Sequence, residues 1–81
     1  MDFMGARIMH IKPLGSNKTE LTFGNVQVLF SYETPVACWM NGEYFKTDKK
    51  WSRTTSKHIN SWVHLATEKP QSFFDNLVKG A

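Results

Sequence analysis

Residues 51–62, with the sequence WSRTTSKHINSW, carry side chains of the types that bind phosphate. Arg53 and Lys57 supply positive charge, and three hydroxyl side chains stand between them. If a helix begins here, its first backbone N–H groups lack partners and attract an anion. Cations, hydroxyls and free amides are the groups that contact nucleic-acid phosphates. The segment therefore predicts an anion-binding site; the alternative is that Thr54 or Thr55 only caps the helix, which stabilises it by about 1 kcal/mol.

The positive charge of the chain is concentrated around this segment. The formal net charge is +3, yet residues 46–58 hold five lysines and arginines against one aspartate. The remainder of the chain holds five basic and six acidic residues. Such a cluster indicates an anionic partner, with a merely solvated basic loop as the alternative. The predicted binding residues are Lys46, Lys49, Lys50, Trp51, Arg53, Thr54, Thr55, Ser56, Lys57 and His58.

Aromatic side chains point to two kinds of partner. Trp51 lies outside any regular pattern, so we expect its ring to be exposed. Nucleic-acid bases stack on such rings for about 1–3 kcal/mol each. Aromatic anchors also dominate protein–protein interfaces. The predicted protein-contact residues are Trp39, Tyr44, Phe73 and Phe74.

No constellation of catalytic residues stands out in the sequence. Cys38 is predicted to lie in mid-strand on an apolar face, where cysteine behaves as a small hydrophobe. His10, His58 and His64 are scattered, and the last two do not share a helix face, so we expect no metal site. We therefore expect a protein that is not an enzyme and has no catalytic residue, metal or cofactor.

Length and composition indicate one small globular domain, residues 1–81. Such a chain buries roughly 60–65% of its unfolded surface, so its core is thin. An apolar content of 41% argues against disorder, and a single cysteine suits a reducing compartment. We recognise no leader peptide or membrane span, and expect a cytoplasmic protein without membrane contact.

The dipeptide Gly24-Asn25 separates two β-rich runs, as in a hairpin with a two-residue loop. This register pairs Phe23 with Val26 and separates apolar from polar side chains, as a half-buried sheet requires. The apolar face is predicted to hold Leu21, Phe23, Val26, Val28, Phe30 and Tyr32.

A second hairpin is predicted at Asn41-Gly42, because both positions tolerate positive φ. Its register pairs Met40 with Glu43 and places Val36 on the same face as Cys38. The sequence thus predicts two hairpins in succession.

Pro35 interrupts the long β-rich run between the hairpins, so we expect a bulge or bend there. Apolar residues recur at helical spacing across residues 59–66 and predict a helix over Thr55–Ala66. A second, short helix is expected over residues 71–80, closed by Gly80. With a first strand at residues 6–12, the prediction is an α+β fold: a four-stranded antiparallel meander, one main helix packed on the sheet, and a short C-terminal helix.

The runs FSYETPVA, residues 30–37, and KTDKKWSRTTSKHINSW, residues 46–62, resemble a family of small uncharacterised bacteriophage proteins. The likeness spans residues 26–63 and leaves out the first strand and the C-terminal tail. It implies a viral origin and action in a host bacterial cytoplasm, and it brings no assigned activity.

Two functions are expected from these observations. The first is non-enzymatic binding of nucleic acid, or of another phosphate-bearing partner, through the basic segment. The second is inhibition of a host protein, such as a defence or transcription component, through aromatic contacts. A homodimer formed through the C-terminal tail is left open.

Overall fold

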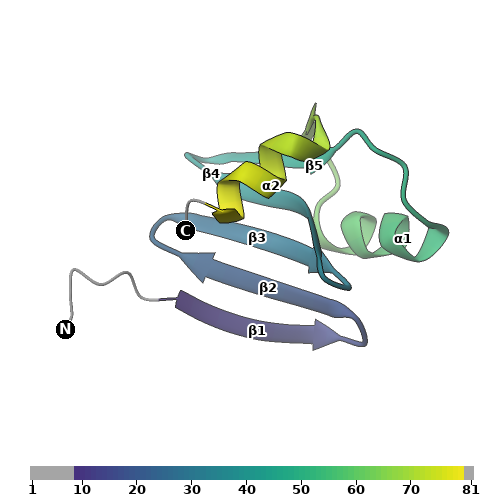
Figure 1. The fold of residues 1–81 in the computed structure, drawn as a ribbon, viewed down its shortest axis with the longest axis horizontal. Coiled ribbons are helices and arrows are strands. Elements are labelled where there is room, and N and C mark those ends of the chain that lie inside the picture. The colour runs from purple at the N-terminus through teal and green to yellow at the C-terminus, as the bar shows by residue number, and fades with distance from the viewer. Residues whose placement is uncertain (1–8, 80–81) are drawn as a thin grey trace.

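The computed structural model describes residues 9–79 and shows one six-stranded sheet with two helices (Figure 1). The strands lie side by side in chain order, and neighbours are antiparallel except β5 and β6, which are parallel. The α+β class is therefore confirmed. The elements are β1 (Met9–Gly15), β2 (Lys18–Phe23), β3 (Val26–Ser31), β4 (Thr34–Met40), β5 (Glu43–Thr47), α1 (Arg53–Trp62), β6 (Thr67–Lys69) and α2 (Gln71–Lys79).

Both predicted hairpin turns are present, and both registers are the predicted ones. Phe23 pairs with Val26 across the Gly24-Asn25 turn. In the second turn Asn41 and Gly42 have φ angles of 53° and 79°. Asparagine and glycine adopt this left-handed conformation at little cost, which explains why these short sequences fix the turns.

The predicted number of strands, four, is wrong. Where the sequence predicts one strand bent near Pro35, a two-residue turn at Tyr32-Glu33 reverses the chain and creates β3 and β4. Tyr32 has a φ of 59°, a conformation that costs an L-residue on the order of 1 kcal/mol. It therefore lies in a turn and not on the apolar strand face predicted for it. The expected irregularity is present as a bulge, which shifts the register between Leu29 and Phe30.

The main helix also differs from its predicted bounds. The sequence predicts it over Thr55–Ala66, but α1 begins at Arg53 and ends at Trp62. Val63 is already extended, with a φ of −149° and a ψ of 142°. The chain then enters β6, which supplies the sixth strand by pairing in parallel with β5.

Two predictions at the chain ends are only partly within the described residues. Residues 6–8 of the predicted first strand and the closing Gly80 lie outside them. Within them, β1 continues through Pro13 to Gly15, and the turn to β2 has Asn17 at a φ of 59°. An edge strand accepts proline because its outer N–H groups need no partner.

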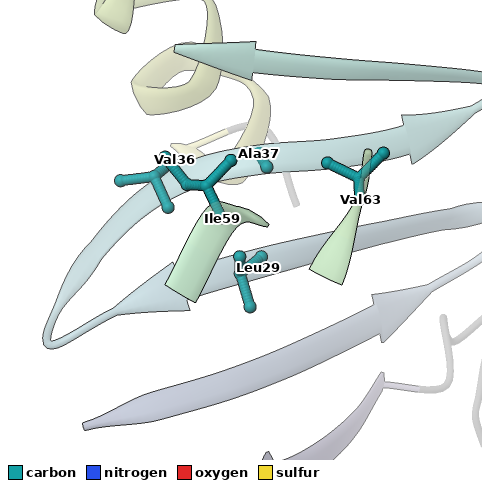
Figure 2. Packing of buried hydrophobic residues seen from close by; sticks show 5 residues of the cluster. All are labelled: Leu29, Val36, Ala37, Ile59 and Val63. Carbon is teal, nitrogen blue, oxygen red and sulfur yellow. The ribbon is translucent and has the colours of Figure 1, made fainter. Parts of the chain in front are cut away.

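The helix α1 covers one face of the sheet and α2 covers the other. The two helices pack against different residues of the same strands, and consecutive strand residues point to opposite sides of a sheet. Figure 2 shows Leu29 of β3 in one cluster with Ile59 of α1 and Val63, the residue that follows α1. Leu14, Trp62 and Ala66 pack around this cluster. The buried cluster on the α1 face consists of Leu29, Val36, Ala37, Ile59 and Val63.

The prediction that Val36 shares a face with Cys38 is wrong, and the bulge explains why. Pro35 pairs with Phe30 and Ala37 pairs with Leu29, so Val36 is an extra residue between two paired ones. This extra residue turns to the α1 face, whereas Cys38 lies in the cluster on the α2 face.

The α2 face is closed by Phe74, which is fully buried. It packs with Phe23, Val28 and Cys38, and the ring of Phe73 lies edge-on to it with centroids 5.1 Å apart. Phe74 is therefore a core residue, and its predicted role as a protein contact is wrong. Neither helix in the described part of the chain has the length and apolar character needed to cross a membrane.

Truncating the core on either face should destabilise the fold strongly. Leu29→Ala and Phe74→Ala each remove a fully buried side chain, and such changes cost about 2–5 kcal/mol. Leu65→Ala, at an 88% exposed position, should change stability by less than about 0.5 kcal/mol. Urea unfolding followed by circular dichroism measures all three, and a cost for Phe74→Ala as small as that for Leu65→Ala would contradict the two-faced core.

Candidate nucleic-acid interface

The helix α1 presents a polar, acid-free face to solvent. Each helical residue advances about 100° around the axis, so Arg53 and Lys57 lie opposite the buried Thr55 and Ile59. Asn60 lies on the same outward side and is exposed. The whole of α1 lacks aspartate and glutamate. The exposed side of this helix can therefore meet an anion without like-charge repulsion.

The N-terminal end of α1 is capped by Ser52, not by Thr54 or Thr55 as predicted. The Ser52 hydroxyl accepts a hydrogen bond from the backbone N–H of Thr55 over 3.1 Å. No acidic side chain lies in the first turn to neutralise the positive end of the helix dipole. The field at this end therefore adds to the charge of Arg53.

A small polar pocket of about 170 Å³ lies beside α1, where the end of β5, the following loop and β6 meet the helix. Three predicted lysines line it, and Ser56 contributes from the helix. Asp48 and Glu68 line it too, so the lysines outnumber the carboxylates by one. Its lining residues are Lys46, Thr47, Asp48, Lys49, Lys50, Ser56, Ile59, Asn60 and Glu68.

Trp51 is exposed, as predicted, but its ring is held in place. The indole N–H donates to the side-chain oxygen of Gln71 over 3.1 Å, and the ammonium of Lys49 lies 4.0 Å from the ring centroid. Gln71 in turn donates to the backbone carbonyl of Pro35 over 2.7 Å. Trp51 as a whole is 42% exposed, and one face of its ring is already occupied by the Lys49 ammonium.

Thr55 is buried and therefore cannot contact an anion in solution. Its side chain is 5% exposed, and its hydroxyl lies 2.9 Å from the hydroxyl of Ser31, which is 1% exposed. A threonine on the core-facing side of the helix cannot also face solvent. Its hydroxyl instead forms a hydrogen bond that links the start of α1 to the end of β3.

His58 belongs to the same network on the flank of α1 away from the pocket. The Ser52 hydroxyl donates to that of Thr55 over 3.3 Å, the Thr55 and Ser31 hydroxyls lie 2.9 Å apart, and the Ser31 hydroxyl lies 2.8 Å from His58 Nδ1. Burial and the nearby charge of Lys18 lower the pKa of His58, which favours the neutral ring.

The ten predicted residues thus divide into four groups. Lys46, Lys49, Lys50 and Ser56 meet at the pocket, and Arg53, Thr54 and Lys57 are exposed on α1. Thr55 and His58 serve the hydrogen-bond network, and Trp51 stands beside Lys49.

Three residues near the site were not predicted from the sequence. Asn60 is neither charged nor aromatic, yet it is exposed on the outward side of α1 and lines the pocket. Ser52 was overlooked because three hydroxyl residues follow it and each is an acceptable cap. Lys18 comes from β2, and its ammonium donates to Ser61 of α1 over 3.1 Å, a contact between distant parts of the chain that no local pattern reveals.

The predicted protein-contact residues differ in how far they are exposed to solvent. Trp39 and Phe73 are half-buried, whereas Tyr44 is 40% exposed and packs edge-on against Trp62 with ring centroids 5.7 Å apart. Leu65, which was not predicted, is the most exposed of the large apolar side chains in the described residues. Tyr44 and Leu65 together line two adjoining hollows of about 470 and 300 Å³.

Cys38 lies fully buried among apolar side chains of the α2 face. Burial raises the pKa of its thiol to about 11, so it stays protonated at neutral pH and is a poor nucleophile. Within residues 9–79, histidine, cysteine, aspartate and glutamate do not gather in groups of three or more that could hold a metal ion.

The chain belongs to a family described as a family of unknown function, DUF8033, which matches residues 9–76. No curated protein and no solved structure matches the chain. The match covers every strand and α1, and it reaches into α2. The chain is thus a member of a family whose function is unknown.

Acid should weaken the attachment of α1 to the sheet through His58. The pKa of His58 is lower in the folded protein than its ordinary value of 6.5, so the folded state favours the neutral ring. The resulting stabilisation is fully present above about pH 6.5 and is lost as the pH falls through the lowered pKa. The free energy of unfolding, measured in urea at several pH values between about 7.5 and 5, should fall across this window.

The variant His58→Gln should flatten this pH dependence, because it removes the titrating ring. His64→Gln, at an exposed position beyond α1, is the matched control and should retain the wild-type profile. If the stability of His58→Gln fell between pH 7.5 and 5 as much as that of the unmodified protein, the assignment of this titration to His58 would be wrong.

Proposed function

We propose that this protein binds nucleic acid, or another phosphate-bearing partner, without catalysing a reaction. The surface that makes this contact consists of the exposed side of α1 and the lysines at the neighbouring pocket. One observation supports the proposal above all. The segment between Asp48 and Glu68 contains no acidic residue, and it contains four basic ones: Lys49, Lys50, Arg53 and Lys57.

The distribution of charge favours an extended anion. Lys49 and Lys50 lie at the pocket on one flank of α1, and Arg53 and Lys57 follow on its outward side. Within residues 9–79, none of the side chains of Lys50, Arg53 and Lys57 is engaged in a hydrogen bond to another protein group. Unengaged cations in a row suit a polyanion such as a nucleic acid.

The pocket suits one phosphate group better than a complete small molecule. Its volume of about 170 Å³ is below the roughly 300–1,000 Å³ of pockets that hold drug-sized ligands. The Ser56 hydroxyl and the three lysines are donors that a phosphate oxygen accepts from. Because Asp48 and Glu68 offset most of the lysine charge there, a free, small anion is a weaker ligand than a polyanion that also reaches Arg53 and Lys57.

Removing four charges should abolish binding while leaving the fold intact. The variant carrying Lys49→Gln, Lys50→Gln, Arg53→Gln and Lys57→Gln changes only exposed side chains. Every phosphate that the variant no longer neutralises should reduce the slope of log K against log salt by about 0.9 on duplex DNA, or about 0.7 on single strands. Fluorescence anisotropy at several salt concentrations measures both the affinity and the slope.

A pair of double variants separates the site from the overall charge. Arg53→Gln with Lys57→Gln and Lys12→Gln with Lys79→Gln remove the same charge at exposed positions, but only the first pair lies on α1. The α1 pair should show the larger decrease in affinity and in salt dependence. Equal decreases in the two pairs would show that net charge, and not this surface, governs binding.

The second candidate function is inhibition of a host protein in the cytoplasm of an infected bacterium. It is favoured by the exposed Leu65 and Tyr44, which line two adjoining hollows. Tyrosine is one of the residue types that carry most of the binding energy in protein interfaces, and Leu65 adds exposed apolar surface beside Tyr44. This surface lies at the C-terminal end of α1 and is separate from the basic pocket.

Affinity capture from host lysate after nuclease treatment distinguishes the two functions. A protein inhibitor should retain a stoichiometric partner after nuclease, and Tyr44→Ala with Leu65→Asp should lose it. The charge-neutral variant of α1 should still capture it. A captured protein that disappears with nuclease, or that binds the Leu65 variant equally well, would rule out this surface as an inhibitory interface.

A further inference from the structure

Resting on the proposed function, we infer that the partner is duplex DNA and that α1 enters its major groove. Arg53, Lys57 and Asn60 then face the base edges, and the lysines on the flanks of the helix contact phosphates. Three features of the molecule support this placement: the chemistry of the outward face of α1, the basic groups on both of its flanks, and the fixed ring of Trp51.

The outward face of α1 carries side chains that read bases and not only phosphates. Arg53, Lys57 and Asn60 follow at i, i+4 and i+7 and therefore share one side of the helix. Arginine bonds with guanine O6 and N7, and asparagine with adenine N6 and N7, through paired hydrogen bonds in the major groove. A surface selected only for charge has no need of an asparagine between the cations and the helix end.

The dimensions of α1 agree with this placement. Its ten residues span about 15 Å, and a helix with its side chains is about 10–12 Å wide. The major groove of B-form DNA is about 12 Å wide and admits one such helix. In Figure 1, α1 lies at one end of the molecule, to the side of the sheet region that α2 covers.

Basic groups stand on both flanks of the helix, as the two phosphate backbones that border a groove require. Lys49 and Lys50 lie on the pocket flank with Ser56. Lys18 lies on the opposite flank, where its ammonium contacts Ser61. Phosphate contacts of this kind fix the orientation of a helix in the groove while base contacts supply specificity.

The α1 helix is also held firmly enough to read a sequence. Ile59 is buried in the core, the Thr55 hydroxyl bonds with Ser31 in the sheet, and the Trp62 indole donates to Glu20 over 2.9 Å. These contacts fix the helix at its start, middle and end. Its outward side chains therefore project from a rigid element, as base recognition requires.

Two observations argue against other nucleic acids. Trp51, the exposed ring on which an unpaired base would stack, is fixed by Gln71 and carries Lys49 over one face, which makes it a poor platform for single strands. Double-stranded RNA has a deep and narrow major groove that side chains cannot read. Duplex DNA is the form whose groove accepts this helix.

The first test compares three probes of one sequence in fluorescence anisotropy: duplex DNA, duplex RNA and single-stranded DNA. Duplex DNA should bind at least about tenfold more tightly than the other two. Equal or weaker binding of duplex DNA would overturn the inference while leaving the proposed function standing. Absence of salt-dependent binding to all three would overturn both.

The second test separates base reading from charge. On a duplex selected by the protein from a random pool, Arg53→Lys keeps the charge but loses the paired geometry of the guanidinium, and Asn60→Ala removes the amide. Both should reduce the preference for the selected duplex over a scrambled one by about tenfold, with an unchanged salt slope. Lys79→Arg and Asn76→Ala, both at exposed positions on α2, are the matched controls and should leave the preference intact.

Methylation of guanine N7, which lies in the major groove, supplies a further readout on the selected duplex. Bound protein should protect this atom, and Arg53→Lys should remove the protection. Protection confined to minor-groove atoms, or a sequence preference untouched by Arg53→Lys and Asn60→Ala, would overturn the placement of α1.

Discussion

The fold depends on a central strand that is buried on both faces. Val28 and Leu29 are adjacent in β3 and both are fully buried, yet adjacent strand residues point to opposite sides of a sheet. Each face therefore needs its own cover. Leu29 is covered by Ile59 and Val63 at α1, and Val28 is covered by Phe74 of α2. A single helix could not bury both residues, so the C-terminal helix is as necessary to the core as the main one.

The same constraint orients the basic surface. Because the apolar side of α1 must face Leu29, its polar side is forced outward, and Arg53, Lys57 and Asn60 become exposed together. Thr55 lies within the core-facing side and bonds with Ser31. Core packing thus decides which hydroxyls and cations of the segment are free to meet a partner and which are structural.

The sequence predicts what is local and misses what is not. Gly24-Asn25 and Asn41-Gly42 fix their turns because their backbones accept left-handed φ at little cost. Tyr32-Glu33 gives no such signal, since a tyrosine at positive φ is disfavoured by its own sterics and is held there by the surrounding structure. Its backbone N–H donates to the carbonyl of Asn17, in a different turn, over 2.7 Å.

The candidate site shows the same division. Charge and residue type predict the location of Lys49, Lys50, Arg53 and Lys57 correctly as an exposed basic surface. Thr55 and His58 do not belong to this surface because both lie within hydrogen-bonding distance of Ser31, which is more than 20 residues away in sequence. Lys18 of β2 likewise comes next to α1 only through the tertiary structure, where its ammonium contacts Ser61. Local patterns therefore locate the surface, while its limits are set by contacts between distant strands and α1.

The most direct measurement of the central claim is an NMR titration of the isotope-labelled protein with a short DNA duplex, following every backbone amide. Binding by α1 predicts shifts for Lys49, Lys50 and the amides of Arg53–Trp62, which diminish as salt is raised. The amides of α2 and of β1 should move little. Shifts centred on α2 or on the Leu65 loop, with those of Arg53–Trp62 unchanged, would contradict the account.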